Sequence, residues 1–167
     1  MVTDKFLRAR DDGLSTGAAF LDMSKAFDKV QHQTLVEDLF QLGISGTALN
    51  WLSDYLSNRQ QVVISGDSSS SFTCSSGVPQ GSVLGPLLFV IYVRDVASEV
   101  DQFAVQVTQF ADDIMLHDSR KDKVVLSHNL SSAITHLSNW LGERNLILNS
   151  RKTQILFIPA NRHDDKT

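Results

Sequence analysis

Two adjacent aspartates, Asp112 and Asp113, interrupt an apolar stretch that reads QFADDIML. The apolar residues around them predict buried strands, and a carboxylate buried without a partner is costly in free energy. Either the pair lies at an exposed turn, or it holds something positively charged. A third aspartate, Asp22, ends another apolar stretch, GAAFLDM. Adjacent strands could bring all three carboxylates together, and such a cluster would suit a hard divalent cation such as Mg²⁺.

The composition is that of a globular chain without an excess of basic residues. The 167 residues carry a formal net charge of −4, and Cys74 is the only cysteine, which excludes an internal disulfide. Proteins that bind nucleic acid unaided usually present a basic face. We therefore expect this chain to use bridging cations or to belong to a larger, more basic protein. No apolar run reaches the ~20 residues that span a bilayer, so we expect no membrane partner. The single cysteine and an N-terminus without the apolar region of a secretory signal favour an intracellular location, the nucleus or the cytoplasm.

The elements that must position the aspartates mix helices with antiparallel strands, which predicts an α+β fold with helices packed on one face of a sheet. Periodicity and turn residues predict strands at 17–23, 60–65, 71–75, 145–149 and 153–158, and helices over 31–57 (broken at Gly43 and Gly46), from Pro86 to 92, and over 126–141. Residues 102–117 are predicted to form two strands around a tight turn, with Asp112 and Asp113 at or near its tip.

Four blocks of the sequence follow one another in a familiar order: FLDMSKAFDKVQH, SSGVPQGSVLGPLLF, QFADDIML and LNSRKTQILF. In order and approximate spacing they resemble the palm domain of reverse transcriptases, most closely those of the non-LTR (LINE-type) retrotransposons. The resemblance covers residues 14–158. It implies a polymerase palm with an antiparallel, ferredoxin-like sheet, and the activity of an RNA-directed DNA polymerase.

The resemblance assigns the aspartates to catalysis. Asp22, Asp112 and Asp113 would hold two Mg²⁺ ions, which Mn²⁺ could replace, for in-line transfer of deoxynucleotides to a primer 3′-hydroxyl. Asp113 is expected to contribute less directly. Lys152 stands where the family has a lysine near the triphosphate, which is proposed to protonate the leaving pyrophosphate. An exposed loop lysine is the structural alternative.

The resemblance also implies a nucleotide pocket. Phe27 would be the aromatic gate under the incoming sugar, Gln80 would contact the nucleotide, and Gly81 would leave room beside it. The structural alternative for Phe27 is an ordinary core residue. For Gln80 and Gly81 it is an ordinary surface turn. Arg94 stands where the family commonly has asparagine, and we expect it to be a tolerated surface change.

The expected domain organisation is a palm over residues 14–158, an N-terminal remnant over 1–13 and a polar tail over 159–167, with fingers and thumb largely absent. A parent protein would supply these and an endonuclease, and its partners would be an RNA template, a DNA primer and deoxynucleoside triphosphates. One alternative is a catalytically silent palm fragment that serves as a scaffold or interaction module. A nucleotide cyclase and an RNA-binding module are less compatible with the blocks, because GVPQGS and SRKT argue against the first and the acidic FADD against the second.

Overall fold

The computed structural model describes residues 2–65 and 68–160, and they form two compact units. The first, which we call the sheet unit, comprises the described residues up to Ser24 together with residues 95–143 and those from Ile147 onward. The second, which we call the helical unit, comprises residues 25–94 and 144–146. Each unit is described by itself.

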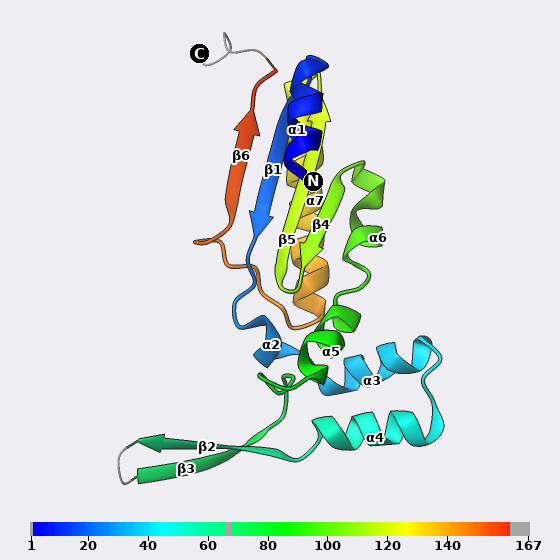
Figure 1. Ribbon diagram of the computed structural model, residues 1–167, viewed down its shortest axis with the longest axis vertical. Coiled ribbons are helices and arrows are strands. Elements are labelled where there is room, and N and C mark those ends of the chain that lie inside the picture. Colours follow the sequence, from blue (N-terminus) through cyan, green and yellow to red (C-terminus); the bar gives the residue numbers. More distant parts are fainter. Residues whose placement is uncertain (1, 66–67, 161–167) are drawn as a thin grey trace. The chain divides into compact units, whose positions relative to one another are not determined.

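The sheet unit contains a four-stranded antiparallel sheet in the order β4-β5-β1-β6 (Figure 1). Its strands are β1 (Ser15–Leu21), β4 (Gln106–Phe110), β5 (Asp113–Arg120) and β6 (Gln154–Ile158). Helix α7 (Lys123–Glu143) connects β5 to β6. This strand order, with every neighbouring pair antiparallel, is that of a ferredoxin-like sheet, so the predicted α+β fold class is confirmed.

Helix α7 covers one face of the sheet. A Cβ added at Gly17 of β1 would come within 2.5 Å of the Leu130 side chain, so the absence of a side chain there lets helix and strand approach closely. Seven apolar positions of α7 were expected on one face; Ile134 and Trp140 are only partly buried, and five are buried: Leu126, Leu130, Ala133, Leu137 and Leu141. These side chains form the core on this side of the sheet.

Helix α1 (Val2–Asp11) lies against the opposite face of the sheet (Figure 1) and was not predicted. The ring of Phe6 meets that of His117 edge-on, with centroids 5.3 Å apart. His117 pairs with Ala18, the neighbour of Gly17, and successive residues of a strand point to opposite faces. The first residues of the chain therefore cover part of the face that α7 leaves open.

Some predicted boundaries in the sheet unit were wrong. Residues 145–149 form no strand, and only an isolated bridge joins Leu148 to Met23. The chain before β4 forms α6 (Val96–Val100) and a 3-10 turn, η1 (Asp101–Phe103). No helix among residues 2–65 and 68–160 is long and apolar enough to cross a membrane.

Apart from α2, which was not predicted, the helical unit follows the predicted order of elements. It contains α2 (Ala26–Lys29), α3 (His32–Gln41), α4 (Gly46–Leu56), the hairpin β2 (Arg59–Ser65) and β3 (Ser68–Cys74), and α5 (Leu84–Tyr92). The predicted break falls between α3 and α4, where Gly43 has φ +89°. Serines 68–71, predicted to belong to the connection, lie within β3 instead, and Gly66 and Asp67 lie outside the described residues.

A charged cluster ties the helices of this unit together. Asp38 of α3 is 5% exposed and forms ion pairs with Arg94 and Arg144. Arg94 also donates to the Gln41 side chain at 3.1 Å, and its own side chain is only 24% exposed. Arg94 was expected to be a surface change, but it is a half-buried ion-pair partner, because the cost of burying Asp38 is offset by cations.

Candidate active site

Asp22 is positioned by the register of the sheet. Leu21, the last residue of β1, pairs with Ile114, so Asp22, directly after the strand, comes near Asp113, which in turn pairs with Phe110 of β4. Side chains alternate between faces along a strand. Asp22 therefore continues the face that carries Phe20, which is 42% exposed, rather than the face covered by α7.

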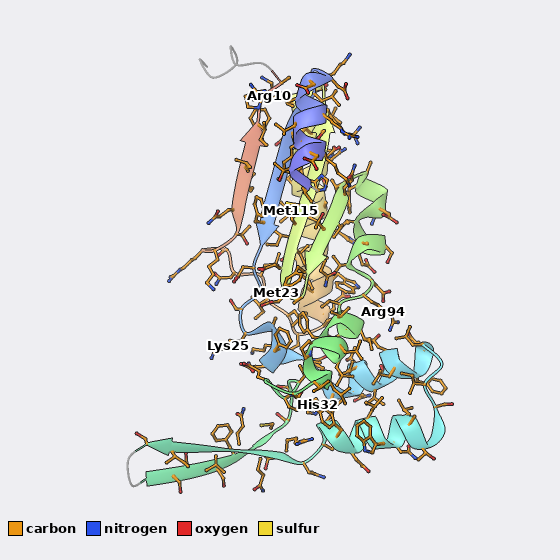
Figure 2. All side chains as sticks on the ribbon, in the orientation of Figure 1. Arg10, Met23, Lys25, His32, Arg94 and Met115 are labelled. Carbon is orange, nitrogen blue, oxygen red and sulfur yellow. The ribbon has the colours of Figure 1, made fainter. Side chains whose placement is uncertain are left out.

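An open cavity of about 650 Å³ lies along this face. Asp22, Asp113 and Lys152 all line it, so the structure brings together three of the predicted site residues. Met115, which is labelled in Figure 2, and the 83%-exposed Phe110 supply part of its apolar wall. The cavity thus combines two carboxylates and two cations, Lys152 and Arg151, with apolar surface at the open part of the sheet.

Asp112 occupies the tip of the β4–β5 hairpin, as predicted, but it is not among the residues that line this cavity. Asp113 is already the first residue of β5. Ala111 connects the end of β4 to Asp112 and has φ 53°, a backbone conformation that residues other than glycine rarely adopt. Gln109 donates to the carbonyl of Ala111 at 3.2 Å and supports this strained turn. Strain of this kind is typical of functional sites.

Lys152 is placed by a turn built on Asn149. The backbone N–H of Asn149 donates to the carbonyl of Asp22 at 2.8 Å, and its side-chain oxygen accepts from the N–H of Arg151 at 3.2 Å. The turn places Lys152 Nζ 3.5 Å from Asp22 Oδ2, with the lysine side chain 68% exposed. A contact of this length and exposure contributes little to stability, so the lysine remains available to a ligand.

The Asp22 carboxylate fits a hard cation. Its Oδ1 is buried and, among residues 2–65 and 68–160, has no hydrogen-bond partner. No three histidine, cysteine or acidic side chains in this part of the chain form a metal-holding group. Mg²⁺ is commonly bound through one or two carboxylates, with water and substrate phosphates completing its shell. Asp22 and Asp113 supply the one or two carboxylates that such a site needs. The Oδ1 atom of Asp22, which has no hydrogen-bond partner among the described residues, is the atom available to a cation.

Phe27 lies in the helical unit, on the short helix α2. Its ring stacks on that of Phe89 of α5, with centroids 4.5 Å apart and planes inclined by 23°. The stack fixes the ring, and Phe27 remains only partly buried. A rigid, partly exposed aromatic ring is compatible with both the predicted gate and the core alternative.

Gln80 and Gly81 belong to the loop between β3 and α5 in the same unit. The Gln80 side-chain amide donates to Asp28 Oδ1 at 2.7 Å. Gly81 has φ +78°, and a Cβ there would meet nothing within 4 Å. The space around the Gly81 position is open, and the Gln80 side chain, the predicted nucleotide contact, is held by the Asp28 carboxylate.

Sequence reasoning missed two residues of the sheet-unit site. Arg151 lines the cavity beside Lys152, and Asn149 organises the turn that presents both. A signal was available for Asn149, because asparagine side chains often accept a hydrogen bond from a backbone N–H two residues on, as in the Asn149-Ser150-Arg151 segment. Nothing in the spacing indicated Arg151.

Comparison with known proteins agrees with this geometry. Residues 3–165 match the family model for reverse transcriptase (RNA-dependent DNA polymerase). A probable RNA-directed DNA polymerase from transposon BS of Drosophila melanogaster is 32% identical over 91% of this chain and 17% of its own length. The RNA-directed DNA polymerase from the Drosophila melanogaster mobile element jockey is 31% identical over 80% of this chain and 15% of its own length. The chain thus spans less than a fifth of either relative.

Solved structures show the same fold. Apo telomerase from Candida tropicalis, truncated from its C-terminal domain, has a TM-score of 0.71 at 18% identity, over 93% of this chain and 34% of that one. Telomerase from Candida albicans in complex with a fragment of telomeric RNA has a TM-score of 0.70 at 14% identity, over 93% of this chain and 31% of that one. The fold is that of a polymerase palm, and the chain belongs to the reverse transcriptase family, of the LINE type found in non-LTR retrotransposons.

Proposed function

We propose that this chain is the catalytic palm of an RNA-directed DNA polymerase, which adds deoxynucleotides to a DNA primer on an RNA template. The observation that carries the proposal is the open cavity of the sheet unit. There Asp22 and Asp113 line one surface, and Asp22 Oδ1 is buried without a partner among the described residues. Membership in the reverse transcriptase family supports the same chemistry.

Two divalent ions, Mg²⁺ or in its place Mn²⁺, would neutralise charge on the attacking and leaving oxygens when bound here. The family resemblance assigns them to Asp22 and Asp112, with Asp113 as an auxiliary ligand, and of the two hairpin aspartates Asp113 is the one that lines the cavity. Strand pairing holds Asp113, and a backbone hydrogen bond from Asn149 holds Asp22 directly after β1, so these carboxylates would need little reorganisation on binding. Lys152, 3.5 Å from Asp22 Oδ2 and mostly exposed, would donate a proton to the leaving pyrophosphate.

In the helical unit we propose that Phe27, Gln80 and Gly81 shape the pocket for the incoming nucleotide. The Phe27–Phe89 stack would keep the ring rigid, and a rigid ring would clash with a ribose 2′-hydroxyl. The open space at Gly81 would admit the backbone of a nucleic acid close to the loop.

The wider setting is part of the proposal. Residues 14–158 would be the palm, 1–13 a remnant of a preceding segment and 159–167 a polar tail, within a parent that carries fingers, thumb and an endonuclease. The net charge of −4 supports a larger partner, because this chain has no cationic excess with which to bind phosphates. Template copying would take place in the nucleus or the cytoplasm.

Primer extension on an RNA template with Mg²⁺ tests the function. We expect the full chain to extend the primer and Asp112→Asn to abolish extension. Asp101→Asn, which changes an exposed aspartate in the same unit, is the matched control and is expected to extend normally. Equal extension by wild type and Asp112→Asn would overturn the proposal. No extension by any of the three would favour the alternative, a catalytically silent palm that serves as a scaffold or interaction module.

A further inference from the structure

The segment around Asp28 and the loop that carries Gln80 are held together by several contacts within the helical unit. The backbone N–H groups of Gly77 and Val78 donate to the carbonyls of Val30 and Phe27, at 2.8 and 2.9 Å. Ser76 Oγ donates to the Asp28 carbonyl at 3.0 Å. The helix that carries the predicted gate and the loop that carries the predicted nucleotide contact therefore form one local structure.

The close approach of the two segments depends on Gly77. A Cβ at Gly77 would come within 3.0 Å of the Asp28 Cα and carbonyl oxygen, and Gly77 has φ +92°. His32, labelled in Figure 2, adds a further bond, with its Nε2 2.7 Å from the Gly77 carbonyl oxygen. This packing holds the Asp28 backbone against the loop, and the position of the Asp28 carboxylate relative to the loop is therefore restricted.

The Asp28 carboxylate is the one group in this network that acts on the Gln80 side chain. Gln80 Nε2 lies 2.7 Å from Asp28 Oδ1, and both residues are exposed. An ionised carboxylate only accepts hydrogen bonds, so it can face only the NH₂ end of the amide. Asp28 therefore selects one of the two orientations of the Gln80 amide and, among the residues that the structure describes, leaves Oε1 and the second N–H available to another molecule.

Stability does not explain this pair well. A hydrogen bond between exposed side chains contributes little to folding, because water competes for both groups. The pair also lines a cavity of about 650 Å³ together with two cationic side chains, those of Lys25 and Arg59. A cavity with such a lining suits a ligand that carries phosphates.

We propose that Asp28 is a positioning residue for the incoming nucleotide: it orients the Gln80 amide so that its free Oε1 and N–H face the deoxynucleoside triphosphate. The inference rests on the proposed function, because it presumes that Gln80 contacts the nucleotide. It concerns affinity for the nucleotide rather than the chemical step. Asp28 itself touches no reacting atom.

Kinetics of the full chain test the role. We expect Asp28→Ala to raise the KM for the deoxynucleotide about 10-fold, as befits a lost hydrogen bond to a charged group, with kcat little changed. Asp28→Asn keeps an acceptor at this position and should recover most of the loss. In a Gln80→Ala background, Asp28→Ala should have no further effect, because the two residues act as one unit. A merely structural aspartate would instead add its effect to that of Gln80→Ala, and that result would overturn the inference.

The matched control is Glu37→Ala. Glu37 Oε1 accepts from Gln33 Nε2 at 3.1 Å, which is another exposed carboxylate–amide pair in the helical unit. Its removal should leave the KM unchanged. An equal rise in KM for Glu37→Ala and Asp28→Ala would contradict a specific role for Asp28.

A second readout needs no polymerase activity. The side-chain amide signals of Gln80 in an ¹⁵N NMR spectrum should shift toward those of a free amide in Asp28→Ala and stay in place in Glu37→Ala. If Asp28→Ala leaves these signals unmoved, the inference is wrong even where wild type extends primers. If they move but the wild type extends no primer, the positioning contact stands and the proposed polymerase function fails.

Discussion

The sheet unit and the helical unit hold their candidate residues by different means. In the sheet unit, Asp113 is part of the β5 ladder, and Asp22 directly follows β1 and accepts a hydrogen bond at its carbonyl from the N–H of Asn149. In the helical unit, loop hydrogen bonds and a ring stack hold Gln80 and Phe27. Groups fixed by a ladder are suited to chemistry that tolerates little displacement, whereas groups on loops are suited to recognition. Substitutions in the sheet unit should therefore reduce kcat, and those in the helical unit should change affinity or stability.

The largest effect is expected for Asp22→Asn in the sheet unit. Loss of a ligand charge should lower kcat about 1000-fold, since charge neutralisation by a metal is worth several kcal/mol. Folding should be little changed, because Asp22 Oδ1 has no hydrogen-bond partner among the described residues. Single-turnover primer extension and urea unfolding measure the two quantities. A variant that loses stability but not kcat would break the comparison between the units.

Lys152→Met should have the next largest effect. Removing a general acid typically costs about 100-fold in rate, and the 68% exposure of this side chain means that folding should not change. Lys121→Met, an exposed lysine in the same unit, is the control. Single-turnover rates decide the point. An unchanged rate in Lys152→Met would return this residue to the class of ordinary loop lysines.

Gly77→Ala tests how much the close packing within the helical unit contributes to stability. The added Cβ would meet the Asp28 backbone at 3.0 Å and would also sit at φ +92°, so unfolding should become easier by about 2 kcal/mol. Gly81→Ala suffers only the positive φ, with open space around the Cβ, and should cost about 1 kcal/mol. Urea unfolding of both variants measures the difference. Equal losses would show that the close approach at Gly77 contributes nothing.

The smallest effect concerns His117 of the sheet unit. Burial lowers the pKa of His117 below its ordinary 6.5, nearby Lys5 lowers it further, and Asp118 opposes them. As pH falls through about 6.5, the unfolded chain takes up a proton before the folded chain does, so the free energy of unfolding should decrease. His117→Leu should remove this part of the pH dependence, and His128→Gln, at an exposed position, should not. Urea unfolding at several pH values would show whether the two variants differ.

Local patterns were sufficient to predict most elements of both units. The apolar spacing of α7, the glycine break between α3 and α4, and the hairpin tip at Asp112 were all predicted correctly. Helix α1 was missed because its packing partner, His117, lies far away in the sequence and its own apolar pattern is weak. Residues 145–149 were predicted as a strand from their composition, but they make only an isolated bridge and a turn.

Site residues that belong to a sequence motif could be predicted. Contacts between segments distant in the sequence could not. Asp22, Asp112, Asp113 and Lys152 were predicted from the motifs, and the structure places all of them except Asp112 on one cavity. The Asp28–Gln80 bond joins residues 52 positions apart, and no periodicity indicates such a pair. Arg94 was mistaken for a surface residue because its partner, the buried Asp38, could not be identified without the fold.

The central claim is that the sheet gathers distant carboxylates into one cation site, and titration of the labelled chain with Mn²⁺ tests it directly. Paramagnetic broadening of backbone NMR signals would be followed, with Mg²⁺ as competitor. The account predicts that signals of Asp22, Asp112 and Asp113 broaden together at low Mn²⁺ and recover when Mg²⁺ is added. Broadening of Asp22 separately from the hairpin, or only at saturating Mn²⁺, would contradict it.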